Sequence, residues 1–490
     1  MKDFNYYLKK FGEIGFIEES LSSIVYVEGL PEVRPGELVI FETNDGNSKI
    51  DHVGQVLSLT VEYAEVLLFT NEQINVGTKV ARTGETLTMP VGEEMMGKTI
   101  VPLGGMVGEE LKQIDTTPSG LSARSAVNKP LVTGVTIVDL VVPLGKGQRE
   151  LIIGDGKTGK TMFLLQTMLT QALSGTICIY AAVGKRQQDT KKVEEFIKKN
   201  KIEKSCVIIA SDAADPAGLV YVTPYAAMSV AEYFRDLGRD VLIILDDLTT
   251  HARYYREISL LLRRFPGRDA YPGDIFYAHS RLLERGGCFK LGNKEVSISC
   301  LPVAESKLGD LSGFIQTNLM AITDGHIYFD RDLFNKGYRP AVSPYLSVTR
   351  VGRQAHIDIV RDISREISSF LVSQTRMRQH IRFGAELGEE VQQKLALGEQ
   401  VSVLFDQTVA YIVPLEASIF MFGALWADIW KGFDKETIKS EIVKVISRYN
   451  KEKSFRDMVI KLVNESKTLS ELKTKIASNP EMVKVNLSHE

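Results

Sequence analysis

The spacing of hydrophobic and polar residues changes twice along the chain. Residues 15 to about 80 alternate short β-rich runs with Gly, Asn and Asp turns, at spacings that suit a small antiparallel barrel. From about 81 to 360, apolar runs of strand length alternate with amphipathic segments of helical period. Beyond about 361, apolar residues recur at helical spacing only. The pattern therefore predicts a multi-domain α/β protein with an N-terminal β-barrel over 1–80, a central α/β domain over 81–360 and a helical domain over 361–490.

The middle domain is expected to contain a parallel sheet. Strands that alternate with helices are typical of parallel α/β folds, and 160–173 and 224–236 carry the amphipathic pattern of such helices. The predicted strands are 150–153, 177–183, 206–210, 241–245, 298–302 and 319–323.

Composition narrows the class of protein. The 490 residues are 44% hydrophobic, enough for a large core, and the formal net charge is only -3. Because 59 basic residues face 62 acidic ones, no global field draws the chain to nucleic acid, and we expect no nucleic-acid partner. The most apolar stretch, 419–430, is too short to span a membrane, and no signal peptide is visible, so we expect neither export nor integral membrane placement.

A glycine-rich sequence, GDGKTGKT, lies at 154–161 between the apolar runs 151–153 and 162–165. Between a strand and a helix, such glycines let successive backbone N–H groups converge on phosphate oxygens. Lys160 would reach the outer phosphates, and the Thr161 hydroxyl can ligate Mg²⁺. The segment predicts a site for ATP or ADP with Mg²⁺. Its predicted cofactor-binding residues are Gly154, Asp155, Gly156, Lys157, Thr158, Gly159, Lys160 and Thr161.

A second nucleotide-site element is the apolar run 241–245, which ends in Asp246 and Asp247. In P-loop enzymes an acidic residue at such a strand end orients Mg²⁺ through its water shell, beside the Ser or Thr of the loop. Two acidic residues after a strand are by themselves more often a solvated turn. Together with Thr161, however, Asp246 becomes the better candidate for a metal-binding residue.

Several longer motifs lie outside the loop, at 246–256, 259–264, 266–268, 270–274 and 279–285, with 133–139, 143–149, 316–318, 323–325 and 334–341. They resemble the motifs of the rotary F-type ATP synthases, and the resemblance covers about 15–430. It implies a barrel crown, a RecA-like P-loop nucleotide domain and a helical bundle, with three alpha-type and three beta-type subunits alternating around a rotating shaft.

The position after the run 177–183 distinguishes the two subunit types. In the resembling family, catalytic beta subunits and related export ATPases carry Gly-Glu-Arg there, and the glutamate polarises the attacking water. This chain has Lys185 after Gly184, and a charged lysine cannot accept a proton from water at neutral pH. The resemblance is therefore to the alpha-type subunit, which holds nucleotide without hydrolysing it. The alternative is an altered catalytic subunit with Asp189 or Asp247 as the base.

The run 347–352, Ser-Val-Thr-Arg-Val-Gly, resembles an alpha-type motif whose arginine reaches the nucleotide of the neighbouring catalytic subunit. The resemblance implies that Arg350 is an arginine finger in trans, which stabilises charge on the transferring phosphoryl group. A lone arginine after a strand is otherwise most often part of a surface ion pair.

Some positions depart from the family pattern. Gly156 and Lys157 stand where alpha subunits usually have Arg-Gln, and Val409 stands where a second adenine-side glutamine is expected. Fourteen residues precede Gly15, about half the usual alpha-type extension that helps dock the peripheral stalk, so we expect atypical stalk contacts. The resemblance implies cofactor contacts on the adenine side at Arg339, Pro340 and Gln407.

Taken together, the resemblance implies a regulatory, non-catalytic alpha-type subunit of an ATP synthase or ATPase that couples ATP synthesis or hydrolysis to ion transport. Its expected partners are a catalytic beta-type subunit in an alternating hexamer and a gamma-type shaft. The expected location is peripheral, at the cytoplasmic face of the cell membrane, or at an organelle inner membrane if the sequence is a mature form. Two alternatives are a self-sufficient homohexameric export- or termination-type ATPase and a ring subunit of an F-type-derived motility motor.

Overall fold

The computed structural model describes residues 2–42, 53–104, 107–382, 389–407 and 411–482. The chain divides into two compact units that interleave along the sequence. The first unit comprises 1–125, 175–305 and 312–322, and the second comprises 126–174, 306–311 and 323–490.

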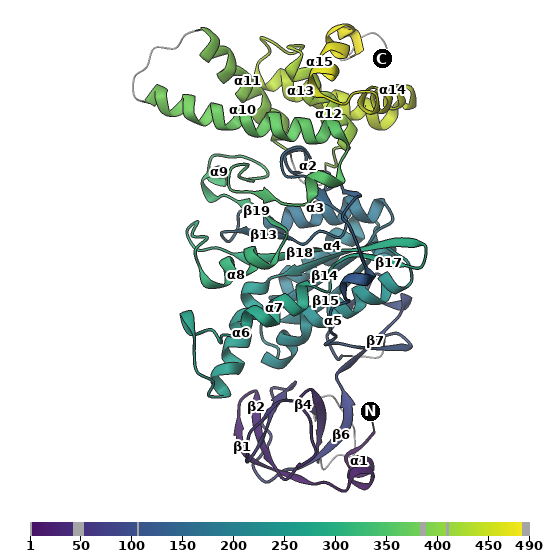
Figure 1. Cartoon of the computed structure of the whole chain (residues 1–490), viewed down its shortest axis with the longest axis vertical. Helices are drawn as coiled ribbons and strands as arrows, with labels where there is room; N and C mark the ends of the chain where they lie inside the picture. Colours follow the sequence, from purple (N-terminus) through teal and green to yellow (C-terminus); the bar gives the residue numbers. More distant parts are fainter. Residues whose placement is uncertain (1, 43–52, 105–106, 383–388, 408–410, 483–490) are drawn as a thin grey trace. The chain divides into compact units, whose positions relative to one another are not determined.

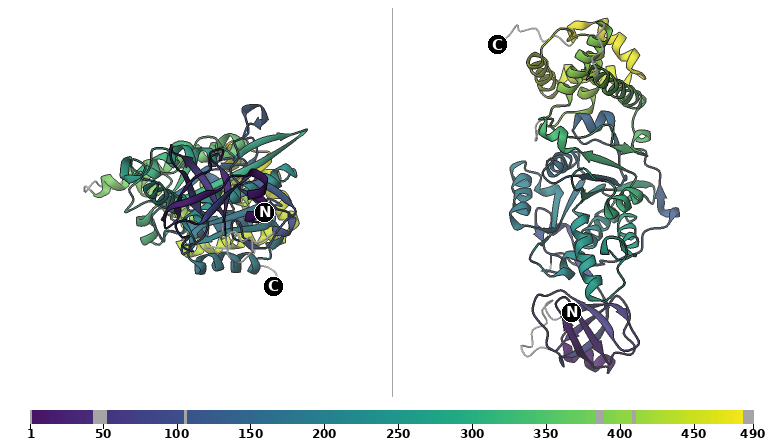
Figure 2. Two further views of the ribbon diagram at one scale, coloured as in Figure 1. Left: turned by 90° about the horizontal axis from the view of Figure 1, so that it is seen from below. Right: turned by 90° about the vertical axis from the view of Figure 1, so that its left-hand side faces the viewer.

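The first unit begins with a closed antiparallel barrel, which confirms the predicted fold of this region (Figure 1, Figure 2). Its strand order is β1-β2-β5-β4-β3-β6, and Val39, Val56 and Val66 are among the side chains that fill its interior. Inward-facing apolar residues of a small barrel supply its core, so the strands need no covering layer on that side. The strands are β1 Gly15–Leu21, β2 Ile24–Glu28, β3 Glu37–Phe41, β4 Val53–Leu59, β5 Ala64–Leu68 and β6 Lys79–Thr86.

A short helix, α1 Phe4–Phe11, packs against the outside of this barrel. The Asp3 side chain caps it by accepting a hydrogen bond from the Tyr6 backbone N–H. Tyr7 is fully buried, and its hydroxyl donates to Glu85 Oε1 at 2.6 Å. The helix is therefore part of the barrel's packed structure.

The first unit also contains parallel strands of the nucleotide-binding domain. β14 Ile177–Lys185 pairs in parallel with β15 Cys206–Asp212 and with β16 Val241–Asp246, and β16 pairs in parallel with β18 Lys294–Glu305. These runs are almost continuously apolar because both faces of a parallel sheet are covered. The helices around them are α4 Gln187–Lys199, α5 Ala217–Asp236, α6 Leu248–Leu261, α7 Ile275–Leu283 and α8 Phe314–Ile322.

One predicted strand, 319–323, is wrong. Residues 314–322 form α8, and the strand is β19 Gly325–Phe329. Ile315 and Leu319 are the buried residues of α8, four positions apart as a helix face requires. A short apolar run does not by itself distinguish a strand from a buried helix.

The predicted helix 224–236 starts too late. α5 begins at Ala217 and continues through Pro224. A proline is favoured at the first position of a helix, which made 224 a plausible start, but the preceding turn is helical as well. The interior proline costs one backbone hydrogen bond, which the burial of most of α5 offsets.

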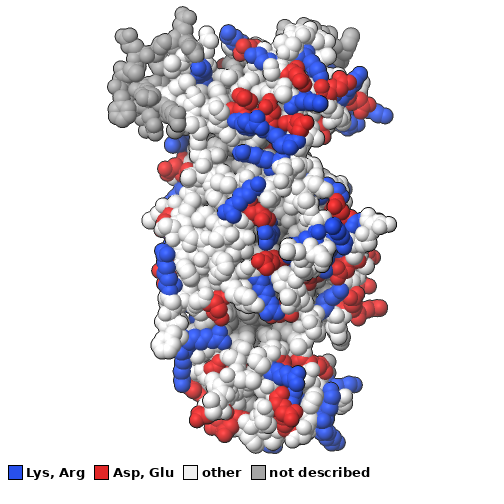
Figure 3. Space-filling view, viewed as in Figure 1, with Lys and Arg blue, Asp and Glu red and all other residues white. Residues whose placement is uncertain are grey.

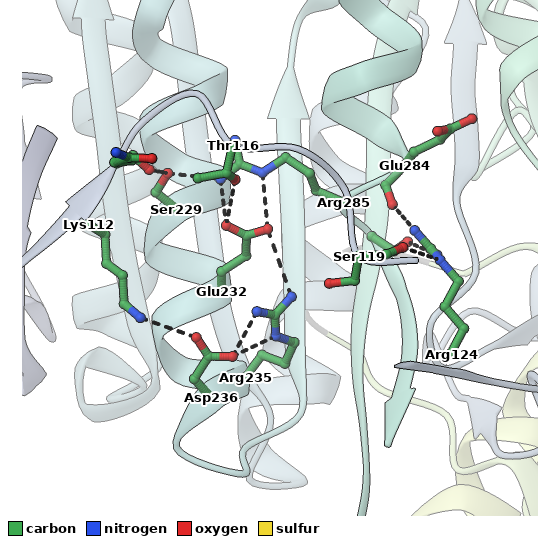
Figure 4. A network of polar contacts seen from close by, with 12 residues as sticks. Lys112, Thr116, Ser119, Arg124, Ser229, Glu232, Arg235, Asp236, Glu284 and Arg285 are labelled. Carbon is green, nitrogen blue, oxygen red and sulfur yellow. Dashed lines mark hydrogen bonds and ion pairs between the residues drawn. The ribbon is translucent and has the colours of Figure 1, made fainter. Parts of the chain in front are cut away.

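A buried arginine ties α5 to the strand β9 Glu110–Gln113 and the segment after it (Figure 4). Arg285 is 1% exposed, and its Nη2 lies 2.6 Å from Glu232 Oε2 on α5. Its Nη1 donates to the Ile114 carbonyl at 2.8 Å. Lys112 on β9 forms an ion pair with Asp236 at the end of α5.

The second unit contains the phosphate-loop strand and the C-terminal helices. β13 Glu150–Gly154 pairs in parallel with β19, and β20 Val348–Thr349 pairs antiparallel with β19. α12 Leu415–Trp426 packs on α13, α14 and α15, and its residues 417–425 are all buried. The other helices are α2 Thr136–Val141, α3 Lys160–Leu173, α10 Asp358–Arg382, α11 Glu389–Phe405, α13 Lys435–Lys451, α14 Lys453–Asn464 and α15 Leu469–Ala477.

Within the described ranges, no helix is both long and apolar enough to cross a bilayer. On the face of the molecule shown in Figure 3, basic and acidic residues are interspersed. This distribution agrees with the near-neutral formal charge of -3.

Candidate nucleotide site

The segment 154–161 forms a loop between β13 and α3, as its sequence predicts. A Cβ added at Gly154 would lie 2.3 Å from the Phe329 carbonyl oxygen, so only glycine fits where β13 passes β19. Gly159, with φ 98°, is the residue before the first turn of α3. This backbone path places the loop at the N-terminus of a helix that spans 160–173, where N–H groups and the helix dipole favour an anion.

The buried Asp155 side chain anchors the loop through hydrogen bonds to the segment 306–309. Its Oδ1 accepts hydrogen bonds from Ser306 Oγ at 2.6 Å and from the Gly309 N–H at 2.9 Å. The Thr158 hydroxyl donates back to the Asp155 carbonyl at 2.8 Å. Asp155 is thus a structural part of the loop, and the segment 306–309 supports the loop.

Lys160 is 7% exposed, and its Nζ donates to the Gly154 and Asp155 carbonyls at 2.7 Å each. Gly156, Lys157 and Thr161 are exposed, Thr161 in the first turn of α3. A lysine fixed beside the loop backbone, with a hydroxyl at the helix start, is the arrangement that P-loop proteins use for phosphate and metal.

Lys185, the last residue of β14, forms an ion-pair cluster in the first unit with Asp246, the last residue of β16, and with Asp247. Lys185 Nζ lies 2.8 Å from Asp246 Oδ1 and 3.4 Å from Asp247 Oδ2. Tyr180, on β14, donates its hydroxyl to Asp246 Oδ2 at 2.5 Å. Both aspartates are only 4% exposed.

The charges in this cluster keep Lys185 protonated. Burial alone would lower the pKa of Lys185, but the charges of Asp246 and Asp247 outweigh it and raise this pKa above its ordinary value. Burial and the charge of Asp246 raise the pKa of Tyr180 well above its ordinary value. The cluster therefore combines a lysine cation, two carboxylates and a neutral phenol.

Sequence reasoning singled out Lys185 and Asp246 separately and missed their contact. The signal that would have joined them is positional: both residues end strands of one parallel sheet, and β14 pairs with β16. Side chains at the carboxyl ends of neighbouring parallel strands meet at one edge. Tyr180 had no sequence signal, because a buried tyrosine in an apolar run looks like core.

On the predicted adenine side, Arg339 and Pro340 line a cavity of about 200 Å³ in the second unit, with Ile137, Tyr338 and Phe405 among the other lining residues. The Arg339 guanidinium stacks on the Phe334 ring, 3.6 Å from its centroid. Its Nη1 donates to the Phe334 carbonyl at 2.8 Å. The guanidinium is therefore fixed against the backbone beside the cavity.

The Gln407 side chain binds backbone groups. Its Oε1 accepts from the Thr136 N–H at 3.0 Å, and its Nε2 donates to the Gly134 carbonyl at 2.6 Å and the Tyr411 carbonyl at 2.5 Å. Its backbone N–H donates to the Arg339 carbonyl at 2.6 Å. Gln407 therefore links Arg339 to the start of α2. Val409 lies outside the described residues.

Arg350 lies on an anchored loop after β20, and its side chain is exposed. Its backbone N–H donates to the Asp324 carbonyl at 2.9 Å, and Asp324 also pairs with Arg149 at 2.7 Å. A Cβ at Gly352 would lie 1.9 Å from the Pro143 carbonyl oxygen. The loop backbone is therefore fixed on both sides of an exposed arginine.

Among the described residues, no group of three or more His, Cys, Asp or Glu side chains could hold a metal ion.

Comparison of the sequence with those of known proteins shows which family the chain belongs to. A sequence model described as the ATP synthase alpha/beta family, nucleotide-binding domain, matches residues 134–349. The ATP synthase subunit alpha of Petrotoga mobilis is 36% identical, across 94% of this chain and 92% of its own length. The chain belongs to the ATP synthase alpha-subunit family. The subunit alpha of Staphylococcus epidermidis is 38% identical over 84% of this chain and 82% of its length, and the ATP synthase subunit alpha 2 of Syntrophus aciditrophicus is 39% identical over 81% and 76%.

Family membership confirms the fold class, with barrel, nucleotide-binding domain and C-terminal helices. It also makes the region 134–349 an ATP- or ADP-binding domain and the chain part of an ATPase complex that associates peripherally with a membrane. The match spans the loop 154–161 and Asp246, and ends at Thr349, next to Arg350.

Proposed function

We propose that this chain is a non-catalytic, alpha-type nucleotide-binding subunit of a rotary F-type ATP synthase or ATPase. It binds ATP or ADP at 154–161 and supplies Arg350 to the catalytic site of a neighbouring beta-type subunit. The observation that carries this proposal is the Lys185 ammonium, ion-paired with Asp246 and Asp247 at the strand end where catalytic relatives carry a glutamate. A protonated lysine cannot activate water as a base.

The arginine-finger role is supported by the loop that carries Arg350. Its backbone is fixed through Asp324 and Gly352 while the side chain is exposed, which suits a residue that acts on a neighbouring subunit. A preorganised cation that meets the transferring phosphoryl group lowers the barrier without reorganisation at the moment of reaction.

The nucleotide contacts proposed from the sequence divide into two groups. Around the phosphates, the loop 154–161 is supported by its backbone path and by Lys160, and Thr161 is the hydroxyl that would meet Mg²⁺. On the adenine side, Arg339 and Pro340 are supported by the cavity they line, while Gln407 would act by holding Arg339. Asp246 fits a metal less well, because Lys185 and Tyr180 already contact both of its oxygens.

The proposed complex is an alternating hexamer with a beta-type subunit around a gamma-type shaft, at the cytoplasmic face of the membrane. It couples ATP synthesis or hydrolysis to transport of an ion such as the proton. A homohexameric export- or termination-type ATPase would need a catalytic base where Lys185 stands. A motility ring is the third arrangement, since the same hexamer can drive another load.

Affinity purification of the tagged chain from its native cell tests the assembly. The proposal expects a beta-type chain in equal amount together with a shaft subunit. A ring of this chain alone would contradict it, and motility or surface-structure proteins in place of ion-transporting partners would favour the third arrangement.

A further inference from the structure

The loop that carries Arg350 is held in place by a buried glutamine. We propose that Gln148 is a positioning residue for Arg350: its side-chain amide fixes Thr349, and through Thr349 it holds the exposed guanidinium in one geometry. The inference rests on the proposed arginine-finger role of Arg350 and adds the residue that fixes the finger. Every residue in the argument belongs to the second compact unit.

The Gln148 side chain is 2% exposed, and both ends of its amide are hydrogen-bonded. Its Nε2 donates to Thr349 Oγ1 at 3.1 Å and to Glu150 Oε2 at 2.6 Å. Its Oε1 accepts from the Gly145 N–H at 2.8 Å. Because a backbone N–H can only donate, the contact with Gly145 determines which end of the amide faces Thr349. Gln148 is therefore a fixed donor to the Thr349 hydroxyl.

The Thr349 hydroxyl connects the backbone on the two sides of Arg350. It accepts hydrogen bonds from Gln148 and from the Gly352 N–H, at 3.1 Å each, and it donates to the Pro143 carbonyl at 3.3 Å. These three bonds use the full capacity of a hydroxyl, which has one donor and two acceptor sites. Thr349 comes directly before Arg350, and Gly352 follows two residues after it. The position of the arginine therefore depends on where this hydroxyl is held.

Gln148 is itself anchored on the strand that leads to the phosphate loop. Glu150, the first residue of β13, is fully buried and lies opposite Gly325 of β19, which pairs in turn with Thr349. A Cβ at Gly325 would lie 2.2 Å from the Val348 carbonyl oxygen and 2.6 Å from Glu150 Oε2, so only glycine fits between them. Burial raises the pKa of Glu150 well above its ordinary value, which favours a neutral carboxyl as the acceptor for the Gln148 amide.

An arginine finger depends on its position more than the fold depends on any one hydrogen bond. A preorganised cation stabilises the transferring phosphoryl group, and a displacement of about 1 Å can cost roughly a hundredfold in rate. Without Gln148, the Thr349 hydroxyl would keep its contacts with Gly352 and Pro143. We therefore expect the loop to stay folded while the arginine loses its single position.

The test is steady-state ATP hydrolysis by the purified complex, followed by release of labelled phosphate. Gln148→Leu removes the amide at similar side-chain size and should lower kcat by roughly tenfold to a hundredfold, with KM within about threefold of the wild type. In a complex that already carries Arg350→Ala, Gln148→Leu should change kcat by less than about twofold, because no finger is left to position. The matched control is Gln171→Leu, since Gln171 is also buried and donates to the Val132 carbonyl at 2.7 Å. Its kcat should stay near the wild-type value.

Thr349 provides a second pair of variants that decides the question even if Gln148→Leu does not fold. Thr349→Val removes the hydroxyl that accepts from Gln148 and keeps a similar shape, at a residue that is only half-buried. It should lower kcat as Gln148→Leu does, again only when Arg350 is present. Thr349→Ser keeps the hydroxyl and should retain most of the turnover. Circular dichroism checks that each variant chain is folded.

An unchanged kcat in the folded Gln148→Leu or Thr349→Val complex would overturn the inference and leave the finger role intact. A loss of kcat that is equally large with and without Arg350 would also overturn it, because Gln148 would then have a structural role only. If Arg350→Ala by itself left kcat unchanged, the proposed finger role and the inference would fail together.

Discussion

At the residue scale, Arg350 makes the most direct prediction for the assembled complex. Because its side chain is exposed on a loop fixed through Asp324, its removal should not disturb the chain's own fold. Arg350→Ala should reduce ATP hydrolysis by the complex by about a thousandfold or more, as a lost arginine finger does. Turnover of the purified complex and ATP binding by the isolated chain measure the two effects separately.

The isolated Arg350→Ala chain should bind ATP as tightly as the wild type. Arg353→Ala is a suitable control, since Arg353 is exposed three residues further along. If the variant complex kept most of its turnover, or if the loss came from weaker ATP binding by this chain, the finger role would be refuted.

A pair of buried histidines predicts a loss of stability at low pH. His251 Nε2 donates to the Tyr221 carbonyl at 3.1 Å, which leaves His251 Nδ1 to accept from His279 Nε2 at 3.2 Å. Burial lowers the pKa of His251 to about 4 and the pKa of His279 well below its ordinary value. Both rings are therefore neutral in the folded chain where the unfolded chain would protonate them.

The unfolded state binds more protons than the folded state below pH 6.5, so stability is complete above that pH and falls as the pH approaches 4. For His251 alone the loss is on the order of 3 kcal/mol. The midpoint of thermal unfolding, followed by circular dichroism, should therefore drop between pH 6.5 and 4.5. In His251→Gln this pH dependence should be shallower, and an equally steep drop would argue against the histidine pair as its source.

The contact between Lys185 and Asp246 shows what sequence patterns leave out at this scale. Both residues were evident in the sequence, and each was assigned a role from its own motif: Lys185 in place of the catalytic glutamate, and Asp246 as a metal-binding residue. Which side chain meets which depends on strand pairing, in this case the neighbouring β14 and β16. Gln407 is similar: its residue type suited an adenine contact, but its amide is bonded to backbone groups at 134, 136 and 411.

At the scale of elements, the network around Arg285 gives a stability prediction. The guanidinium is buried and bonds to Glu232 on α5, to Ser229 and to the Ile114 carbonyl. Arg285→Ala would remove a buried cation from Glu232, which would keep only Thr116 and a longer ion pair with Arg235, and the Ile114 carbonyl would keep only Ser229. The loss should cost roughly 3 kcal/mol. Urea unfolding, followed by circular dichroism, measures the loss.

The matched control is Arg263→Ala. Arg263 also forms an ion pair, with Glu19, but its side chain is 68% exposed, so its loss should cost less than about 1 kcal/mol. If both substitutions lowered the free energy of unfolding by the same amount, burial would not explain the contribution of Arg285.

The hydrophobic pattern predicted most helices and strands of the nucleotide-binding domain, and the two errors have physical reasons. Helix 160–173 matches α3 because the glycines before residue 160 and the apolar period after it both indicate a helix that begins there. The strand predicted at 319–323 is wrong because a short apolar run fits both the strand period and the helix period, and only its packing in the fold decides between them. The predicted start of α5 is wrong because proline is favoured at the first position of a helix, whereas the residues before Pro224 are already helical.

At the scale of the whole molecule, the order of segments along the chain differs from their grouping in space. The compact second unit joins 126–174 to 323–490, because β13 pairs with β19 across a long insertion. Hydrophobic patterning reports on local periods and cannot reveal such long-range pairing. The division into 1–80, 81–360 and 361–490 therefore stays a prediction about domains, as the roles of the individual site residues do.

Helix α1 leads to a prediction about the stability of the barrel. Because Tyr7 is buried on the barrel and bonded to Glu85, α1 stabilises the barrel directly. Deletion of residues 1–10 should lower the thermal unfolding midpoint and increase protease cleavage within 15–86. A truncated chain with the unfolding midpoint and cleavage pattern of the intact chain would contradict this role of α1.

The central claim, that this chain holds nucleotide without hydrolysing it, is tested most directly by steady-state ATP hydrolysis of the purified full-length chain. The reference is Lys160→Ala, which removes the phosphate-loop ammonium. We predict that the wild-type chain binds ATP in a titration but hydrolyses it no faster than Lys160→Ala does. Hydrolysis clearly above that background, and abolished by Lys160→Ala, would contradict the account.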